Sequence, residues 1–326
     1  MGSKYSVRKY QEGDYENWNS FIGQAKNATF LFHRDFMDYH KDRFEDFSLM
    51  VFNEKTLIAV LPANRVDNLL YSHQGLTYGG LVYNDKLTLA SIIIVFKDVL
   101  AFLNENKIEK LTLKTTPSIY HKKPAEELLY ALFLSEAQLI RRDTLSVIDL
   151  TKEFSFSKIR KRGIQKGMSK GLIIKEEPDF KSFWDEILIP NLAQRHNTKP
   201  VHCLEEIIRL KKDFPTNIRQ FNVYYQGKIV AGTTVFETDK VAHCQYISKF
   251  EKEKNLGSLD FLYDYLIHKV FADKHFFDFG VSNETQGKKL NEGLSYWKES
   301  FGASTIVHDF YEVETINYSK LEHILV

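Results

Sequence analysis

The sequence is poor in cysteine, proline and glycine. Its two thiols, Cys203 and Cys244, cannot form a disulfide framework and are too few for an iron–sulfur cluster or a zinc finger with several cysteine ligands. Seven prolines and 16 glycines among 326 residues leave little material for long flexible linkers. Because scarce thiols are typical of a reducing compartment, we expect a cytoplasmic protein.

Long hydrophobic runs and an excess of one charge are also missing. The most apolar stretch, 89–103, contains Lys97 and Asp98 and is shorter than the ~20 residues that span a bilayer, so we expect no transmembrane segment. The N-terminus has no charged start followed by an apolar block, and we expect no secretory signal. With 44 Lys plus Arg against 43 Asp plus Glu, the chain lacks the basicity of a dedicated nucleic-acid binder. Local basic patches remain compatible with this balance.

The residues that are present describe an ordinary globular protein of two domains. Hydrophobic residues make up 43% and charged residues 27%, far from the composition of a disordered chain. A length of 326 residues corresponds to about two domains. The 11 histidines form no recognisable ligand pattern with carboxylates, so we predict no metal site.

Both halves of the chain show the same order of strand-like and helix-like patterns, β-β-β-α-β-α-β. Leu57 and Ile229 occupy equivalent places, 172 residues apart, so the repeat has the size of a domain. We predict an α+β fold with two tandem domains, 1–150 and 151–326, each a mixed and mostly antiparallel sheet flanked by helices. The patterned segments are 47–65, 68–78, 87–104, 110–114, 125–138 and 144–150, and then 220–225, 229–237, 242–248, 259–273, 276–279, 290–301 and 305–313.

This element order is similar to the GNAT acyltransferase fold, and four motifs resemble its FemAB-like branch. The motifs are 277–280 (FDFG), 293–303 (GLSYWKESFGA), 159–167 (IRKRGIQKG) and 195–200 (RHNTKP). The resemblance implies an N-acyltransferase that moves an acyl group from acetyl-CoA or another acyl-CoA to an amino group of a cell-envelope or polysaccharide precursor. Such an enzyme must orient the carbonyl and the amine, stabilise an oxyanion and remove a proton.

Three residues are predicted to carry this chemistry. Lys298 lies four residues before Gly302, where GNAT enzymes often carry a tyrosine that acts as general acid for the departing thiolate and FemAB-like proteins similarly have a lysine. By this resemblance the charge of Lys298 would stabilise the acyl centre; the alternative is a solvated lysine. Asp278 alternates with two phenylalanines and should point to the other face of its strand, where it would act as a base or orient a sugar hydroxyl; the alternative is a cap of the following turn. His196 follows a helical pattern and is predicted to act as a base; the alternative is that it only caps the helix.

The acyl donor is predicted to bind the second half, around Lys254, Gly257 and Ser258. By resemblance, the diphosphate of coenzyme A lies on backbone amides at a helix N-terminus, and this stretch offers one glycine and a cation; the alternative is a simple helix cap. In the first half, Phe133 stands where the second half has Lys298 and cannot do acid–base chemistry. We therefore predict that the first domain holds substrate and the second transfers the acyl group.

Two regions are predicted to bind the substrate. Arg160, Arg162 and Lys166 would contact a polyanion, namely a nucleotide-sugar diphosphate, a lipid diphosphate or the acceptor end of tRNA, unless they form only a solvated face. His73 and Tyr78, in the glycine-containing aromatic stretch 71–80, would stack on a sugar or a base, unless this stretch is only a connection. Tyr246 is a further predicted substrate contact.

Two other functions remain open at this stage. An aminoacyl-tRNA could replace acyl-CoA as donor, as in the peptidoglycan-bridge branch of the family. That branch commonly carries a long coiled-coil arm, and this chain has no run of heptads long enough to form one. A non-catalytic sugar-binding relic of the fold is the third reading, and a cleft without ionisable groups would favour it.

Overall fold

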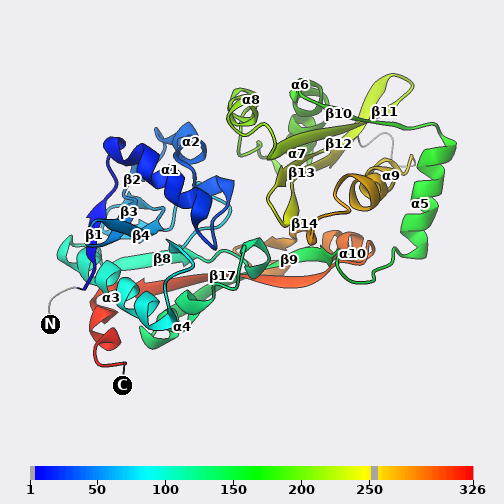
Figure 1. Ribbon diagram of the computed structural model, residues 1–326. Helices are drawn as coiled ribbons and strands as arrows, with labels where there is room; N and C mark the ends of the chain where they lie inside the picture. The colour runs from blue at the N-terminus through cyan, green and yellow to red at the C-terminus, as the bar shows by residue number, and fades with distance from the viewer. Residues whose placement is uncertain (1–3, 251–255, 326) are drawn as a thin grey trace. The chain divides into compact units, whose positions relative to one another are not determined.

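The computed structural model describes residues 4–250 and 256–325, apart from the side chains of residues 195 and 196. The chain divides into two compact units (Figure 1). The first contains Met1–Asp143 and Val307–Val326, and the second contains Thr144–Ile306. These limits differ from the predicted 1–150 and 151–326, because the C-terminal segment belongs to the first unit.

The first unit contains two groups of paired strands. An antiparallel sheet has the order β1 (Ser6–Lys9), β3 (Leu49–Asn53), β4 (Thr56–Leu61) and β7 (Val82–Tyr83). In the second group, the C-terminal part of β17 (Ser304–Glu314) is followed by β8 (Lys110–Lys114), β6 (Leu69–Tyr71), β5 (Asn64–Val66) and β2 (Glu45–Asp46). Of these pairs, β6–β8 is parallel.

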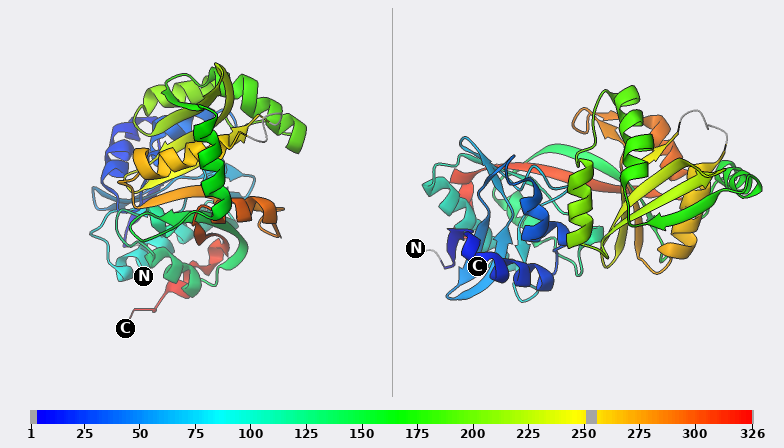
Figure 2. Two further views of the ribbon diagram at one scale, coloured as in Figure 1. Left: turned by 90° about the vertical axis from the view of Figure 1, so that its right-hand side faces the viewer. Right: turned by 90° about the horizontal axis from the view of Figure 1, so that it is seen from above.

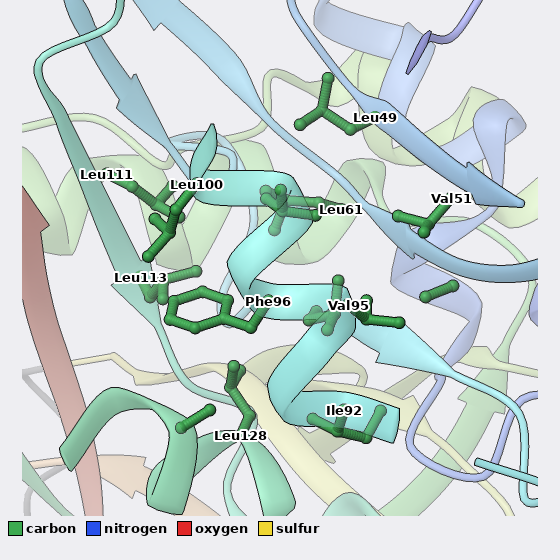
Figure 3. Packing of buried hydrophobic residues seen from close by; sticks show 14 of the residues in the cluster. Leu49, Val51, Leu61, Ile92, Val95, Phe96, Leu100, Leu111, Leu113 and Leu128 are labelled. Carbon is green, nitrogen blue, oxygen red and sulfur yellow. The ribbon is translucent and has the colours of Figure 1, made fainter. Parts of the chain in front are cut away.

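Helix α3 (Leu89–Glu105) supplies much of the first unit's core. Thr88 caps its first turn by accepting a hydrogen bond from the Ser91 amide, and the helix matches the pattern predicted over 87–104. Its buried face packs against strand residues such as Leu61, Leu111 and Leu113 (Figure 3). The other helical segments of this unit are η1 (Glu12–Asp14), α1 (Tyr15–Gln24), η2 (Phe30–Phe32), α2 (Arg34–Met37), η3 (Asp38–His40), η4 (Ser118–Tyr120), α4 (Glu127–Leu134) and η8 (Thr315–Leu321).

The second unit is built on one twisted sheet. Its strand order is β10 (Ile173–Glu177), β11 (Ile218–Tyr225), β12 (Lys228–Glu237), β13 (Val241–Lys249), β14 (Phe276–Val281) and the C-terminal part of β9 (Gln138–Asp149). Only β13–β14 is parallel among these pairs. A small ladder joins β15 (Asn283–Glu284) and β16 (Lys289–Leu290).

Helices cover this sheet in the second unit (Figure 2). Phe221, Tyr263, Phe277 and Phe301 are among the residues that form its apolar core. The helical segments are α5 (Lys158–Ser169), α6 (Lys181–Phe183), η5 (Trp184–Leu188), α7 (Ile189–His196), α8 (Leu204–Asp213), α9 (Ser258–Tyr265), η7 (Leu266–Val270) and α10 (Glu292–Glu299).

The last strand of each sequence half pairs outside its own half. Leu145–Asp149 of β9 pairs with β14, and Phe310–Glu314 of β17 pairs with β8. The predicted α+β class with mixed, mostly antiparallel sheets is therefore confirmed, while the partners of the two terminal strands were not predicted. An alternating pattern shows that a segment is a strand and which side is buried, but it does not specify the neighbouring strand.

None of the helices within residues 4–250 and 256–325 combines the length and apolar character of a membrane span. In the same ranges, no group of three or more His, Cys, Asp or Glu side chains is arranged to hold a metal ion.

Candidate functional site

The candidate site of the second unit lies where the parallel ladder of β13 and β14 ends. The two strands are parallel because α9 crosses over between them. Their ladder has three residue pairs and ends at His243 opposite Asp278, although β13 runs on to Lys249. A register shift in the β12–β13 pairing follows on the other side of β13, after Cys244. Polar side chains gather at this point.

His243 and Asp278 form a pair across these strands. The Asp278 side chain is fully buried, and its Oδ2 lies 2.9 Å from Nδ1 of His243. The other carboxylate oxygen accepts a hydrogen bond of 2.7 Å from the Gly280 amide. With both oxygens engaged, the carboxylate holds the imidazole in the tautomer whose proton is on Nδ1, which leaves the lone pair on Nε2. This is the arrangement that an oriented general base requires.

Asp278 has a different environment from its two neighbours in β14, and its role stays a prediction. Phe277 and Phe279 belong to the apolar core of the second unit, and Asp278 between them points to the other face of β14. His243 was missed by the sequence analysis. The sequence does show that His243 alternates with apolar residues of β13, which indicates that its side chain lies on the other face of the strand. That His243 meets Asp278 depends on the parallel register of β13 and β14.

Lys298 approaches the same place from α10, whose first turn is capped by Asn291. Only 2% of its surface is exposed, so the alternative of a solvated lysine is wrong. Its Nζ donates hydrogen bonds to the carbonyl oxygens of Gly280, at 2.9 Å, and Val281, at 2.6 Å. Burial lowers the pKa of Lys298 to about 8, although the carboxylate of Asp278 acts in the opposite direction.

Gly280 connects these groups. Its amide is bound by Asp278 and its carbonyl by Lys298. The backbone there has φ of +73°, and a Cβ atom would lie 3.3 Å from the imidazole of His243. A residue without a side chain fits both constraints. One residue therefore couples the His243–Asp278 pair to the buried cation.

The other predicted acid–base residue, His196, is the last residue of α7, and Asn197 ends this helix with φ of +47°. The side chain of His196 lies outside the described residues, so its role stays a prediction. Lys254, predicted to bind the donor, is also outside them.

Gly257 and Ser258 form the described start of α9, and Gly257 has a packing role there. Its φ is +71°, and a Cβ atom would lie 2.1 Å from the carbonyl oxygen of Gly163 in α5. The first turn of α9 also carries Asp260. The Gly163 carbonyl oxygen lies close to Gly257, and the Asp260 carboxylate is paired with Arg160 of α5. These contacts hold α5 against the start of α9, and binding of the coenzyme A diphosphate by this stretch stays a prediction.

We expect Gly257→Ala to lower the free energy of unfolding by roughly 2 kcal/mol, because it adds backbone strain and a clash with a backbone oxygen. Urea unfolding measures this. Gly227→Ala is the matched control, since Gly227 has a similar φ of +77° but no atom within 4 Å of a Cβ position. Equal losses in both variants would contradict the close packing of α5 and α9.

The predicted polyanion residues of α5 have different environments. Arg160 turns inward and forms an ion pair of 2.5 Å with Asp260, whereas Arg162 and Lys166 are exposed. Burial raises the pKa of Asp260 although Arg160 opposes this. Gly163 and Gly167 face α9, where Cβ atoms would come within 3 Å of Asp260 and Phe261. The glycines of this basic helix therefore permit close packing.

Tyr246, a predicted substrate contact, is buried in the second unit. Its hydroxyl accepts a hydrogen bond of 3.1 Å from the His202 amide and lies 2.6 Å from His202 Nδ1. Its ring meets Trp184 edge to face at 5.2 Å. Burial raises the pKa of Tyr246 to about 12. These contacts describe an interior residue.

His73 and Tyr78 are buried in the first unit. Their rings are therefore not exposed for the predicted stacking on a sugar or a base. His73 lies against His40 with a ring distance of 5.1 Å, and burial lowers the pKa of His73 to about 3. The Tyr78 hydroxyl donates to Thr29 Oγ1 at 3.1 Å. Phe133, which was predicted to take no part in acid–base chemistry, is 75% exposed in the same unit.

No family model matches the sequence, and no curated protein matches it. Solved structures do match it in fold. FemX has 9% identity and a TM-score of 0.68, with 97% of this chain and 99% of FemX covered.

Two further structures extend this likeness. The C-terminal domain of a putative lysylphosphatidylglycerol synthetase from Agrobacterium fabrum has 12% identity and a TM-score of 0.61, covering 92% of this chain and 91% of that one. A tandem GNAT protein from the clavulanic acid biosynthesis pathway has 10% identity and a TM-score of 0.50, covering 95% and 98%. At these identities the likeness concerns the fold alone: the chain shares the tandem GNAT fold with these solved structures.

Proposed function

We propose that this chain is an acyltransferase that transfers an acyl group to an amino group of a cell-envelope or polysaccharide precursor. The observation that carries the proposal is the His243–Asp278 pair, coupled through Gly280 to the buried Lys298. A base with a fixed tautomer and a nearby cation are the two groups that attack of an amine on an ester carbonyl requires.

In this proposal His243 removes the proton of the attacking amine. The amine nitrogen forms a bond to the acyl carbon, the carbonyl electrons move to oxygen, and Nε2 of His243 accepts the amine proton. When the tetrahedral intermediate collapses, the bond to the leaving oxygen or sulfur breaks and the imidazolium returns the proton to it. Asp278 stabilises the imidazolium, and the charge of Lys298 stabilises the negative charge that develops.

The acyl donor has two candidates. Acyl-CoA follows from the resemblance to GNAT enzymes. The second candidate is an aminoacyl-tRNA ester. The fold likeness to a domain of a putative lysylphosphatidylglycerol synthetase supports an aminoacyl donor, because that name denotes an aminoacylated product.

The relic hypothesis is weakened by the same residues. A binding protein without chemistry gains nothing from placing an imidazole, a carboxylate and a cation around one residue, Gly280, because burial of charged groups is costly. A buried lysine whose pKa is lowered to about 8, as in Lys298, is typical of functional sites.

The test is an acyl-transfer assay with the full chain. Acetyl-CoA and a mixture of aminoacyl-tRNAs are each incubated with nucleotide-linked and lipid-linked amino sugars, and mass spectrometry detects the acylated acceptor. We expect a mass increase of one aminoacyl group with the tRNA donor. An acetyl increase with acetyl-CoA alone would reverse the choice of donor, and no product with either donor would overturn the proposed function.

A further inference from the structure

Gln245 occupies an extra position in β13, two residues beyond the proposed base. Strand β13 lies between β12 and β14 (Figure 1), and its ladder with β14 ends at His243. Its ladder with β12 passes from Cys244 directly to Tyr246, while β12 advances by a single residue. Among the described strands, Gln245 therefore has no cross-strand partner. Such an extra residue is a β-bulge, which re-aims side chains and is frequent next to active sites.

The bulge places the proposed base and Tyr246 on one face of the sheet, although they are three positions apart. Cys244 and its partner Val235 belong to the apolar core, and His243 precedes Cys244, so the imidazole points to the other face. Tyr246 pairs with Thr234, the neighbour of Val235, and therefore also points away from that core. A strand without the bulge would send the two side chains to opposite faces.

The side-chain amide of Gln245 lies beside Tyr246 on this face. Burial raises the pKa of Tyr246 to about 12, and a hydrogen bond with Gln245 acts in the opposite direction. A neighbour lowers the pKa of a phenol when it donates to the oxygen, and a glutamine donates only through its amide nitrogen. The other end of the amide, Oε1, is buried and has no hydrogen-bond partner among the residues that the structure describes.

An unpartnered buried amide oxygen is unfavourable in the ligand-free protein, because burial removes the water that would bind it. Within the described residues, the second unit's other buried side-chain atoms of this kind belong to Arg160, Asn191 and Ser282. Gln245 differs from them because it lies on the strand of His243. The His243 side chain is 13% exposed and Gln245 is partly exposed, so a substrate can reach both, and the terminal torsion of a glutamine turns at little cost.

The transfer reaction itself supplies a donor for this oxygen. A primary amine that attacks the acyl carbon carries two N–H bonds. One proton passes to Nε2 of His243 and then to the leaving oxygen or sulfur, whereas the other hydrogen stays on nitrogen and becomes the N–H of the amide product. A secondary amine or a hydroxyl group loses its single hydrogen to the base and keeps none.

We propose that Gln245 selects a primary amine as the acyl acceptor, because its Oε1 accepts the N–H that stays on the nitrogen. This inference rests on the proposed function and names the acceptor class of the same site. A site built to bind an N–H discriminates against an analogue that lacks it, since the buried acceptor is then left without a partner. Gln245 thereby favours amide formation over ester formation.

Two acceptors compared with the full chain test this selectivity. One is an amino sugar that is acylated in the assay above, and the other is the same compound with an N-methylated amine. We expect the parent protein to prefer the primary amine in kcat/KM. In Gln245→Met, which keeps the length of the side chain but not the acceptor, this preference should fall by about tenfold. Gln245→Glu keeps an acceptor oxygen and should retain most of the preference.

The matched control is Asn191→Leu, which removes another buried amide oxygen that lacks a partner among the described residues of the unit. The Asn191 amide nitrogen donates to Ser248 and to the carbonyl of Lys249 near the end of β13, so the variant perturbs the same strand. Its preference for the primary amine should equal that of the parent. Because the ratio for two acceptors does not depend on the folded fraction, a partly unfolded variant remains informative.

The outcomes separate this inference from the proposed function. A preference that is unchanged in Gln245→Met would overturn the inference while the proposed function stands. Equal losses of kcat/KM with both acceptors would also overturn it and would assign Gln245 to the donor or to folding. If the parent protein acylates no amine with either donor, the proposed function fails and the inference fails with it.

Discussion

Replacing His243 by alanine should lower turnover by about 10² to 10⁴-fold, the range expected when a positioned general base is removed. The structure places Nδ1 of His243 at 2.9 Å from a buried carboxylate, so the loss concerns an oriented imidazole and not merely a polar surface group. Asp278→Asn should also lower turnover, because an amide that donates to Nδ1 would favour the wrong tautomer.

The control is His268→Ala in the same unit. His268 forms a similar pair with Asp264, at 3.0 Å, but both side chains are more than one third exposed. We expect its turnover to stay within about twofold of the parent protein. If His243→Ala kept full turnover on a verified substrate, the proposed base would be refuted.

Replacing Lys298 by methionine should lower turnover by about 10²-fold, as expected for the loss of one preorganised electrostatic group. A solvated lysine could be replaced with little effect on folding. The structure changes that expectation, because Lys298 donates to two carbonyl oxygens of β14. Leaving a buried acceptor without its donor costs about 1 to 3 kcal/mol, so urea unfolding should show a loss of stability as well.

Lys114 in the first unit separates the two effects. It is a half-buried lysine that also donates to two carbonyl oxygens, those of Gln74 and Leu76, and desolvation lowers its pKa to about 8. Lys114→Met should lose comparable stability with turnover nearly unchanged. Equal losses of turnover in both variants would mean that Lys298 acts only through folding.

The pH dependence of turnover offers an independent readout of Lys298. Because its folded pKa is about 8, against 10.5 for an ordinary lysine, turnover should fall as the pH rises through about 8. Between these values the unfolded chain binds more protons than the folded one, so this group makes the free energy of unfolding rise with pH. The Lys298→Met variant should show neither the fall of turnover near pH 8 nor this rise of the free energy of unfolding. If turnover of the variant still falls near pH 8, another group causes the fall.

Parts of the site could be predicted because they depend on local patterns. Asp278 alternates with Phe277 and Phe279, and a strand with two large apolar neighbours in the core sends the middle side chain to the other face. Lys298 was found by its spacing from Gly302 in a motif that resembles a known family. Its burial could not be predicted, because a lysine on a helix is usually solvated.

The other parts depend on residues that are distant in the sequence. His243 meets Asp278 only because β13 and β14 are parallel with that register, which no local pattern specifies. His73 and Tyr78 look like surface binding residues in a polar, glycine-containing stretch, yet the packing of η2, η3 and η4 around them makes them interior.

The sequence by itself determined the type and order of the elements, because hydrophobic period and turn residues are local properties, and the repeat of these elements determined the α+β class. Only the tertiary structure decided which strand lies beside which, with β9 completing the second unit and β17 the first. It also decided that Arg160 turns inward while Arg162 stays exposed, because the glycines of α5 let that face pack against α9. Strand pairing and helix rotation minimise the free energy of contacts between distant segments, so they are properties of the folded chain as a whole.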